Sequence, residues 1–257
     1  MKKIALTSLL AVFAAAGANA ANVIDGNPLY MPRAGHFYSE TALDSRSNAG
    51  EDWTLAEEFG YGITDLLAVN VKTHLSEADS FDAYSWDDVS FGLTARVLQR
   101  GEWRADVYGG YGIVAGLWPY HAPFLAEEGT FYGWNVGIRG GYMTSDWTVA
   151  GHFDFTYTGS ESFNWGDAGV RTFRAGVDGQ YLIDYDWNLV AGVEYTGHDG
   201  DLMPENSGSW IGTFGVNYNI DATKYVGAWI SGGLSHATGD WEWADGIGYG
   251  VKFGIDF

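Results

Sequence analysis

The last ten residues of the sequence, Gly248 to Phe257, read GYGVKFGIDF and alternate between large apolar residues and residues of other kinds. Every second position is aromatic or aliphatic: Tyr249, Val251, Phe253, Ile255 and Phe257. Successive side chains of a β-strand point to opposite faces, so this alternation predicts a strand with one apolar and one polar face. The polar face carries Lys252 and Asp256 among glycines. Such a strand needs an apolar environment on one side and a polar environment on the other.

The same period of two recurs along the chain and predicts about twelve strands. In one of them, for example, Leu67, Val69 and Val71 alternate with polar residues. The predicted strands are residues 34–43, 53–63, 66–75, 89–99, 103–116, 130–143, 147–159, 170–183, 187–197, 210–220, 225–237 and 247–257. All five prolines fall outside these segments, as expected because proline cannot donate a hydrogen bond to a neighbouring strand.

The connectors between these segments alternate between short and long. The short ones lie near residues 64–65, 101–102, 145–146, 184–186 and 221–224. A soluble β-sandwich also has alternating strands, but it rarely sustains strands of about ten residues. A bilayer-spanning barrel needs strands of about that length, an even strand number and one end with short turns. We therefore expect an all-β, antiparallel, up-and-down transmembrane β-barrel of about 12 strands, with 10 or 14 strands as alternatives.

Tryptophans directly follow three of the short turns, in the sequences RGEW, TSDW and DYDW that end at Trp103, Trp147 and Trp187. A ring of tryptophans at one level is typical of a membrane–water boundary. In its strands, turns and tryptophans the sequence resembles the porin-like outer-membrane β-barrels of Gram-negative bacteria, an architecture rather than one family. The resemblance implies short periplasmic turns, longer extracellular loops, an outer-membrane location, and contact with outer-membrane lipid and lipopolysaccharide.

The first residues have the pattern of an export signal. Lys2 and Lys3 precede an apolar run that ends in small residues, which predicts a signal peptide over residues 1–20 with cleavage after Ala20 or Ala21. The run is shorter than the roughly 20 apolar residues that a membrane helix needs. We expect residues 21–33 to form a periplasmic N-terminal segment and residues 34–257 to form the barrel. The sequence contains no cysteine, so we expect neither disulfides nor a lipid anchor.

Assigning the apolar strand faces to lipid leaves a set of charged residues that face the lumen. They are Glu58, Lys72, Arg96, Arg104, Asp106, Arg139, Asp154, Arg174, Asp178, Glu194, Lys252 and Asp256. Folding each hairpin about its short turn places Arg96 opposite Asp106 and predicts further ion pairs between neighbouring strands. These further pairs are Glu58 with Lys72, Arg139 with Asp154, and Arg174 with Glu194. Glu57 is the exception, because its position points it toward lipid, and we expect either a bulge or an incorrect register there.

Acidic residues gather in the long connectors, and the formal net charge of the chain is −20 at pH 7. Nucleic acids select basic surfaces, so we expect no nucleic-acid partner. The acidic loops would form a negative extracellular mouth that concentrates cations and repels anions. The simpler interpretation is that these loops keep the surface soluble and share divalent cations with lipopolysaccharide.

Two stretches have the composition of a hydrolase site. They are TGHDGD, with His198 and Asp199, and SHATGD, with Ser235 and His236. Both signals are weak, because glycine and aspartate are common in loops of any function. The sequence shows no zinc, phosphate-loop or dinucleotide motif. We therefore expect no catalytic residues, no metal and no cofactor, and an enzyme acting on lipid or peptide is the least favoured function.

Two functions remain open at this stage. Twelve strands with charged and glycine-rich inner faces favour a narrow passive channel for small hydrophilic solutes. The alternative is a non-conducting envelope or surface-binding barrel whose lumenal charges form a closed network of ion pairs. The terminal residues Phe253, Ile255 and Phe257 resemble the C-terminal signal of outer-membrane barrels, which implies the outer-membrane assembly machinery as a partner.

Overall fold

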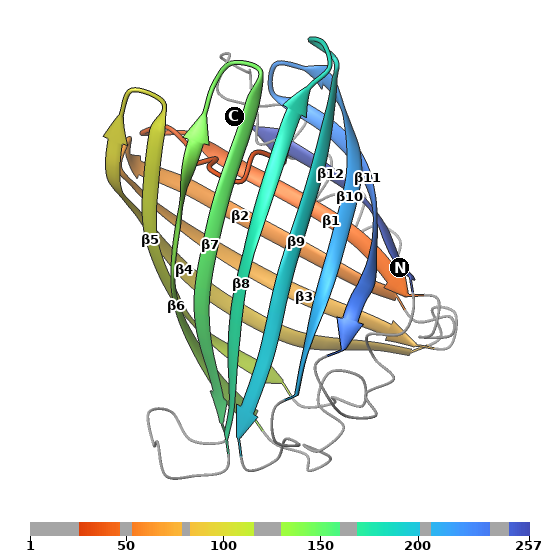
Figure 1. Cartoon of the computed structure of the whole chain (residues 1–257). Helices are drawn as coiled ribbons and strands as arrows, with labels where there is room; N and C mark the ends of the chain where they lie inside the picture. The colour runs from red at the N-terminus through yellow and green to blue at the C-terminus, as the bar shows by residue number, and fades with distance from the viewer. Residues whose placement is uncertain are drawn as a thin grey trace, which may run out of the picture.

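Figure 1 shows the computed structural model of the chain. It describes residues 26–46, 53–78, 83–115, 130–159, 169–200, 207–236 and 247–257. Within these ranges, no helix is long and apolar enough to span a lipid bilayer.

The described residues form a closed barrel of twelve antiparallel strands. The strands are β1 (Phe37–Arg46), β2 (Trp53–Thr64), β3 (Leu67–Ala78), β4 (Ala83–Arg100), β5 (Trp103–Ala115), β6 (Thr130–Met143), β7 (Trp147–Gly159), β8 (Gly169–Leu182), β9 (Trp187–Gly200), β10 (Ser207–Asp221), β11 (Lys224–His236) and β12 (Ile247–Asp256). The expected all-β barrel with 12 strands is confirmed, and the alternatives of 10 and 14 strands are wrong.

The largest departure from the predicted boundaries concerns β4. It begins at Ala83 rather than at residue 89, because its pairing with β3 continues beyond an irregularity between His74 and Leu75. β1 begins at Phe37 rather than at residue 34, since Ala34 makes only an isolated bridge with Gly62. Neither difference changes which residues of these strands share a face.

The barrel closes where β1 pairs with β12. Phe37 and Phe257 exchange both backbone hydrogen bonds there, at 2.7 and 2.8 Å, and their rings stack with centroids 5.8 Å apart. The short turns lie together at one end of the barrel, at the top of Figure 1, and the strand ends that lead into the long connectors lie at the other end. Closure leaves no unpaired strand edge, which is the condition for a β-structure in hydrocarbon.

Large apolar side chains cover the outer face. Phe91, Ile138 and Val177 are 59%, 56% and 56% exposed. Aromatic rings pair near both ends of the wall: Phe37 with Tyr61 and Trp103 with Tyr142 at the short-turn end, and Trp53 with Tyr249 and Tyr195 with Trp210 at the other end. An apolar band between two belts of aromatic rings is the surface that a transmembrane barrel presents to lipid.

Tyrosines on the inner face lie over glycines of the neighbouring strand. Tyr38 is opposite Gly60, and Tyr225 is opposite Gly254. A Cβ atom at Gly60 or Gly254 would come within 1.9 or 2.0 Å of a carbon of the facing ring. Because the glycines lack a side chain, these rings lie against the wall instead of projecting into the middle of the lumen.

Candidate functional site in the barrel lumen

Residues 26–36, which precede β1, lie inside the barrel near its short-turn end. The sequence predicted a periplasmic segment over residues 21–33, without indicating that it enters the lumen. Gly35 N donates to Gly62 O at 2.8 Å, and Gly62 N donates to His36 O at 2.9 Å. Ala34 N donates to Asp65 Oδ1 at 3.0 Å. These bonds fix the end of the segment to β2 and to the turn after it.

From β2 the segment crosses to the opposite wall, as its red trace inside the barrel shows in Figure 1. Leu29 is 1% exposed and Met31 is 7% exposed. At the far end, a Cβ atom at Gly26 would lie only 2.6 Å from Val190 on β9 and 2.8 Å from Asn217 on β10. The segment therefore reaches from β2 to β9 and β10 across the lumen. We refer to residues 26–36 below as the lumenal segment.

Tyr30 links the middle of the lumenal segment to the last strand. Its hydroxyl donates to Asp256 Oδ2 at 2.8 Å, and its ring meets the ring of Tyr38 edge-on, with centroids 5.5 Å apart. Burial raises the pKa of Tyr30 well above its ordinary value, and the neighbouring Asp256 carboxylate raises it further. Tyr30 is therefore a hydrogen-bond donor to Asp256 at any ordinary pH.

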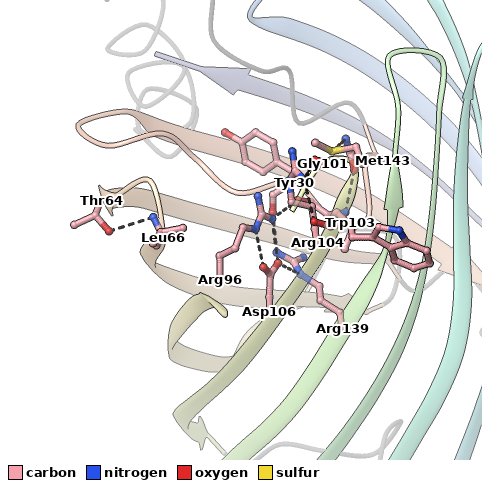
Figure 2. A network of polar contacts seen from close by, with 12 residues as sticks. Tyr30, Thr64, Leu66, Arg96, Gly101, Trp103, Arg104, Asp106, Arg139 and Met143 are labelled. Atoms are coloured by element: carbon pink, nitrogen blue, oxygen red, sulfur yellow. Dashed lines mark hydrogen bonds and ion pairs between the residues drawn. The ribbon is translucent and has the colours of Figure 1, made fainter. Parts of the chain in front are cut away.

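Two arginines of the wall hold the lumenal segment by its backbone. Arg96 Nη2 donates to Leu29 O at 2.6 Å, and Arg139 Nη2 donates to Tyr30 O at 2.7 Å. Both arginines also donate from Nε to Asp106, each at 2.8 Å, and Arg96 adds a second bond from Nη2 at 3.2 Å. Figure 2 shows Asp106 between the two guanidinium groups.

The triad of Arg96, Asp106 and Arg139 is a row across three adjacent strands. Arg96 on β4 lies opposite Asp106 on β5, which lies opposite Arg139 on β6. The Asp106 side chain is 0% exposed and the Arg96 side chain 8%. One carboxylate cannot satisfy all the donors of two guanidinium groups, so the remaining donors are available to the carbonyl groups of the lumenal segment.

A second cluster of charged residues and a histidine lines β7, β8 and β9. Arg174 Nε donates to Asp154 Oδ1 at 2.9 Å. The two ring nitrogens of His152 lie 2.8 Å from Asp178 Oδ2 and 3.1 Å from Glu194 Oε2. These contacts leave much of the cluster open to the lumen, since the side chains of Arg174 and Asp178 are each 43% exposed and that of Glu194 is 34% exposed.

The structure makes one of the four predicted ion pairs. Arg96 pairs with Asp106 as expected, but Arg139 contacts Asp106 instead of Asp154, and Arg174 contacts Asp154 instead of Glu194. The reason is that each strand of a closed barrel has two neighbours. The prediction considered only the neighbour across the short turn, whereas Arg139 and Arg174 bond across the long connectors to β5 and β7.

The remaining predicted lumenal residues lie in three places. Glu58 is directly opposite Lys72, but the hydrogen bonds that it accepts come from Tyr38 OH and from Asn70 Nδ2, the latter at 2.8 Å. Lys252 Nζ lies 3.8 Å from Glu40 and 5.3 Å from the centre of the Tyr225 ring. Arg104 lies at the short-turn edge, where it donates to the Gly101 and Trp103 carbonyl groups.

The two hydrolase-like stretches do not form a described catalytic pair. His198 Nδ1 lies 3.0 Å from Thr172 Oγ1, while the neighbouring Asp199 pairs with Arg171 at 3.4 Å. As consecutive residues of β9, His198 and Asp199 point to opposite faces of the wall. The side chains of Ser235 and His236 lie outside the described part of the structure.

Sequence reasoning missed the residues that cross the lumen. A signal for them exists in the sequence NPLYMPR, where Pro28 and Pro32 enclose the apolar residues Leu29, Tyr30 and Met31. Prolines exclude a central strand, so a short apolar run between them needs another place to be buried. The lumen provides that place.

Glu57 points outward, as its position in the sequence predicted, but without the expected bulge or register error. β2 pairs regularly with β1 and with β3 on both sides of Glu57, and the first irregularity comes only between Gly62 and Thr64. Glu57 accepts hydrogen bonds from Ser39 Oγ, at 2.8 Å, and from Thr41 Oγ1.

No family model and no curated protein sequence matches this chain. Its fold is similar to those of solved outer-membrane channels. An outer membrane channel from Pseudomonas putida F1 aligns with a TM-score of 0.61 at 12% identity, over 92% of this chain and 100% of that chain. The NanC porin aligns with a TM-score of 0.60 at 11% identity, over 84% and 98%. The KdgM porin, solved in complex with disordered oligogalacturonate, aligns with a TM-score of 0.56 at 9% identity, over 86% and 99%.

At these identities the similarity shows a common fold and says nothing of shared solutes or site residues. The fold of this chain is that of the porin-like outer-membrane barrels, as its sequence predicted.

Proposed function

We propose that the chain is an outer-membrane channel for small hydrophilic solutes, which its lumenal segment narrows at the periplasmic end. The membrane location is supported by the apolar outer face, the two belts of aromatic rings and the fold shared with solved outer-membrane channels. In such barrels the short turns face the periplasm. The lumenal segment, which lies at the short-turn end, then occupies the periplasmic mouth.

The observation that carries the channel function is the exposure of charged lumenal side chains on β8 and β9. Arg174, Asp178 and Glu194 are 34% to 43% exposed. Charges that serve only to stabilise a closed interior are paired and covered, as Asp106 is at 0% exposure. The wall beyond the lumenal segment therefore presents hydrated charge to the lumen, which suits the passage of hydrophilic solutes.

The sign of that charge favours cations. The described lumenal acids are Glu40, Asp44, Glu58, Asp88, Asp106, Asp154, Asp178, Glu194 and Asp256, and the described lumenal Lys and Arg residues are Arg33, Lys72, Arg96, Arg104, Arg139, Arg174 and Lys252. A narrow bore with excess negative charge and low-dielectric walls concentrates cations. The acidic connectors, which lie largely outside the described residues, would add negative charge at the extracellular mouth. We therefore assign the channel a preference for cations and neutral solutes over anions.

The lumenal segment also favours the second candidate function, a non-conducting barrel. Its backbone is bonded to Arg96 and Arg139, and the polar side chains of Asn188 and Asn217 at the same end are 0% exposed. If this end stays filled, the open part of the lumen is a cavity that faces the exterior, and the barrel binds solutes without passing them.

Planar-bilayer recording of the purified full chain separates these functions. A channel gives discrete conductance steps, and vesicles that contain it swell in small sugars but not in large ones. A barrel that inserts fully and never conducts at any voltage would favour the non-conducting function. Insertion is checked separately by the resistance of the folded barrel to protease.

A further inference from the structure

The apolar band of the outer face is interrupted by polar residues around Glu57, whereas the outward ion pair of Arg171 and Asp199 lies beyond the aromatic pair of Tyr195 and Trp210. Glu57 points outward from β2, between Leu55 and Phe59. Ser39 and Thr41 on β1 point outward beside it and donate hydrogen bonds to its carboxylate. Thr73 on β3 lies directly opposite Glu57 on the other side. We call Ser39, Thr41, Glu57 and Thr73 the polar row.

The polar row is bounded by apolar residues along the strands. On the short-turn side, the register places Phe59 opposite Val71. On the other side, Leu55 is opposite both Leu43 and Leu75. The outward residues on either side therefore follow the pattern of a lipid-facing wall, and the polar row departs from it. A register error cannot explain the departure, because the pairing of β1, β2 and β3 is continuous through it.

The polar row also lies at the middle depth of the apolar band. Along β2, Glu57 is midway between Tyr61, whose ring packs on Phe37 at the short-turn end, and Trp53, whose ring packs on Tyr249 at the other end. Aromatic belts mark the two membrane–water boundaries. Glu57 is therefore as far from lipid headgroups and from water as an outward residue of this barrel can be.

This depth decides which molecule can cover the polar row. Lipid tails offer no hydrogen bonds, and the polar parts of lipids lie at the boundaries and not at mid-depth. A carboxyl group facing lipid tails is least favourable at that depth. A second protein wall at the same depth can supply further hydrogen-bonding groups, so a partner that covers the polar row is a membrane-spanning protein.

We propose that the polar row is the contact surface with a second copy of this chain. Both copies insert in the same direction, so their polar rows lie at the same depth. A two-fold axis along the membrane normal then brings each row against the other. Within each copy the Thr41 hydroxyl donates to Glu57, and the Thr73 hydroxyl donates to the Asp88 carbonyl at 2.6 Å. The row is self-complementary because these hydroxyl oxygens also accept, so a protonated Glu57 carboxyl of one copy can donate to the Thr41 or Thr73 oxygen of the other.

The wall beside the polar row has a shape that fits a protein contact. An apolar hollow of about 550 Å³ lies on the outer face across β9, β10, β11, β12 and β1. Thr41, which belongs to the polar row, also lines this hollow, together with Leu43, Val226, Val251 and Phe253. A neighbouring wall can pack side chains into the hollow while its polar groups meet the polar row.

The test uses the absence of cysteine from the native sequence. Leu43→Cys and Leu55→Cys place single thiols beside the polar row. Val136→Cys and Val177→Cys are matched controls on β6 and β8, at outward positions that are 52% and 56% exposed. With a short thiol-reactive crosslinker in intact outer membranes, we expect a covalent dimer from Leu43→Cys and from Leu55→Cys. We expect no dimer from the two control variants. Absence of dimer at Leu43 and Leu55, or equal dimer at all four positions, would overturn the proposal.

Substitution of Glu57 provides a second, independent measurement. Glu57→Leu should shift the purified protein from dimer to monomer in sedimentation equilibrium, whereas Glu57→Gln, which keeps the hydrogen-bonding capacity, should remain dimeric. If the native chain is monomeric, or if Glu57→Leu stays dimeric, the polar row is not the contact. Only variants whose folded barrels resist SDS at room temperature are scored. The inference uses the membrane location but not the conductance, so a folded barrel that never conducts would leave it intact.

Discussion

Arg139 donates a hydrogen bond from Nη2 to the backbone carbonyl of Tyr30, at 2.7 Å. The same guanidinium donates from Nε to Asp106, which Arg96 also contacts. Arg139 of the barrel wall thus holds the lumenal segment, which lies outside the twelve strands. The lumenal segment is attached by such contacts and by the end bonded to β2, and the predictions below follow from this attachment.

Replacing Asp106 should destabilise the barrel strongly. Asp106→Asn leaves the buried Arg96 and the partly buried Arg139 adjacent without a carboxylate. Breaking a buried ion pair costs about 3 to 5 kcal/mol in the free energy of unfolding. Asp178→Asn is the control, because Asp178 is 43% exposed and exposed pairs contribute only about 0 to 1 kcal/mol. Reversible unfolding in urea with lipid vesicles measures both variants. Equal losses of stability in Asp106→Asn and Asp178→Asn would show that the triad of Arg96, Asp106 and Arg139 stabilises the barrel no more than an exposed ion pair does.

Gly62→Ala should displace the lumenal segment without harming the wall. A Cβ atom at Gly62 would lie 2.0 Å from the carbonyl oxygen of Arg33, which is a backbone atom of the segment. Gly232→Ala is the matched control, because a Cβ there has no atom within 4 Å. We expect a larger single-channel conductance for Gly62→Ala and an unchanged conductance for Gly232→Ala. An unchanged value for both would mean that the segment does not limit the current.

The excess of lumenal acids predicts cation selectivity. Under a potassium chloride gradient, the reversal potential should have the sign of a cation-selective pore. The selectivity should weaken at 1 M salt, where charges are screened beyond about 3 Å. The double variant Asp178→Asn and Glu194→Gln should weaken it at low salt as well, because it removes exposed negative charge from the lumen. A native channel that selects anions would contradict the assignment.

Deleting Phe257 should impair assembly. The deletion removes both backbone hydrogen bonds with Phe37 at the barrel seam, which together contribute about 1 to 3 kcal/mol. Phe257→Leu keeps these backbone bonds and loses only the ring that stacks on Phe37. The amount of folded protein in the outer membrane measures both effects. If the aromatic ring is the assembly signal, both variants assemble poorly, whereas a defect in the deletion alone points to the seam.

The sequence predicted the wall well because one physical rule governs it. A lipid-facing strand must alternate, and the positions of Val69, Phe91 and Val251 reveal that alternation directly. The predicted pairing of Arg96 with Asp106 is also present, and in the structure it depends on a register shift between Arg96 and Leu98 in that hairpin. The alternation also identified Glu57 as an outward residue. In the structure Glu57 does point outward, and Ser39 donates a hydrogen bond to its carboxylate.

The contacts inside the lumen could not be predicted in the same way. Arg139 bonds across a long connector, whose length does not fix a register, and Tyr30 belongs to a segment without periodicity. His152 reaches Glu194 on β9, a strand that is not its neighbour in the sheet. Such contacts depend on barrel closure and side-chain reach, which local sequence patterns do not encode.

The most direct test of the account compares single-channel conductance of the native chain with that of a variant lacking residues 26–33. The deletion leaves the twelve strands and their pairing complete, because β1 begins at Phe37. We expect a larger conductance for the deletion than for the native chain, with cation selectivity retained. Equal conductance in the two proteins, or none in either folded barrel, would contradict the account.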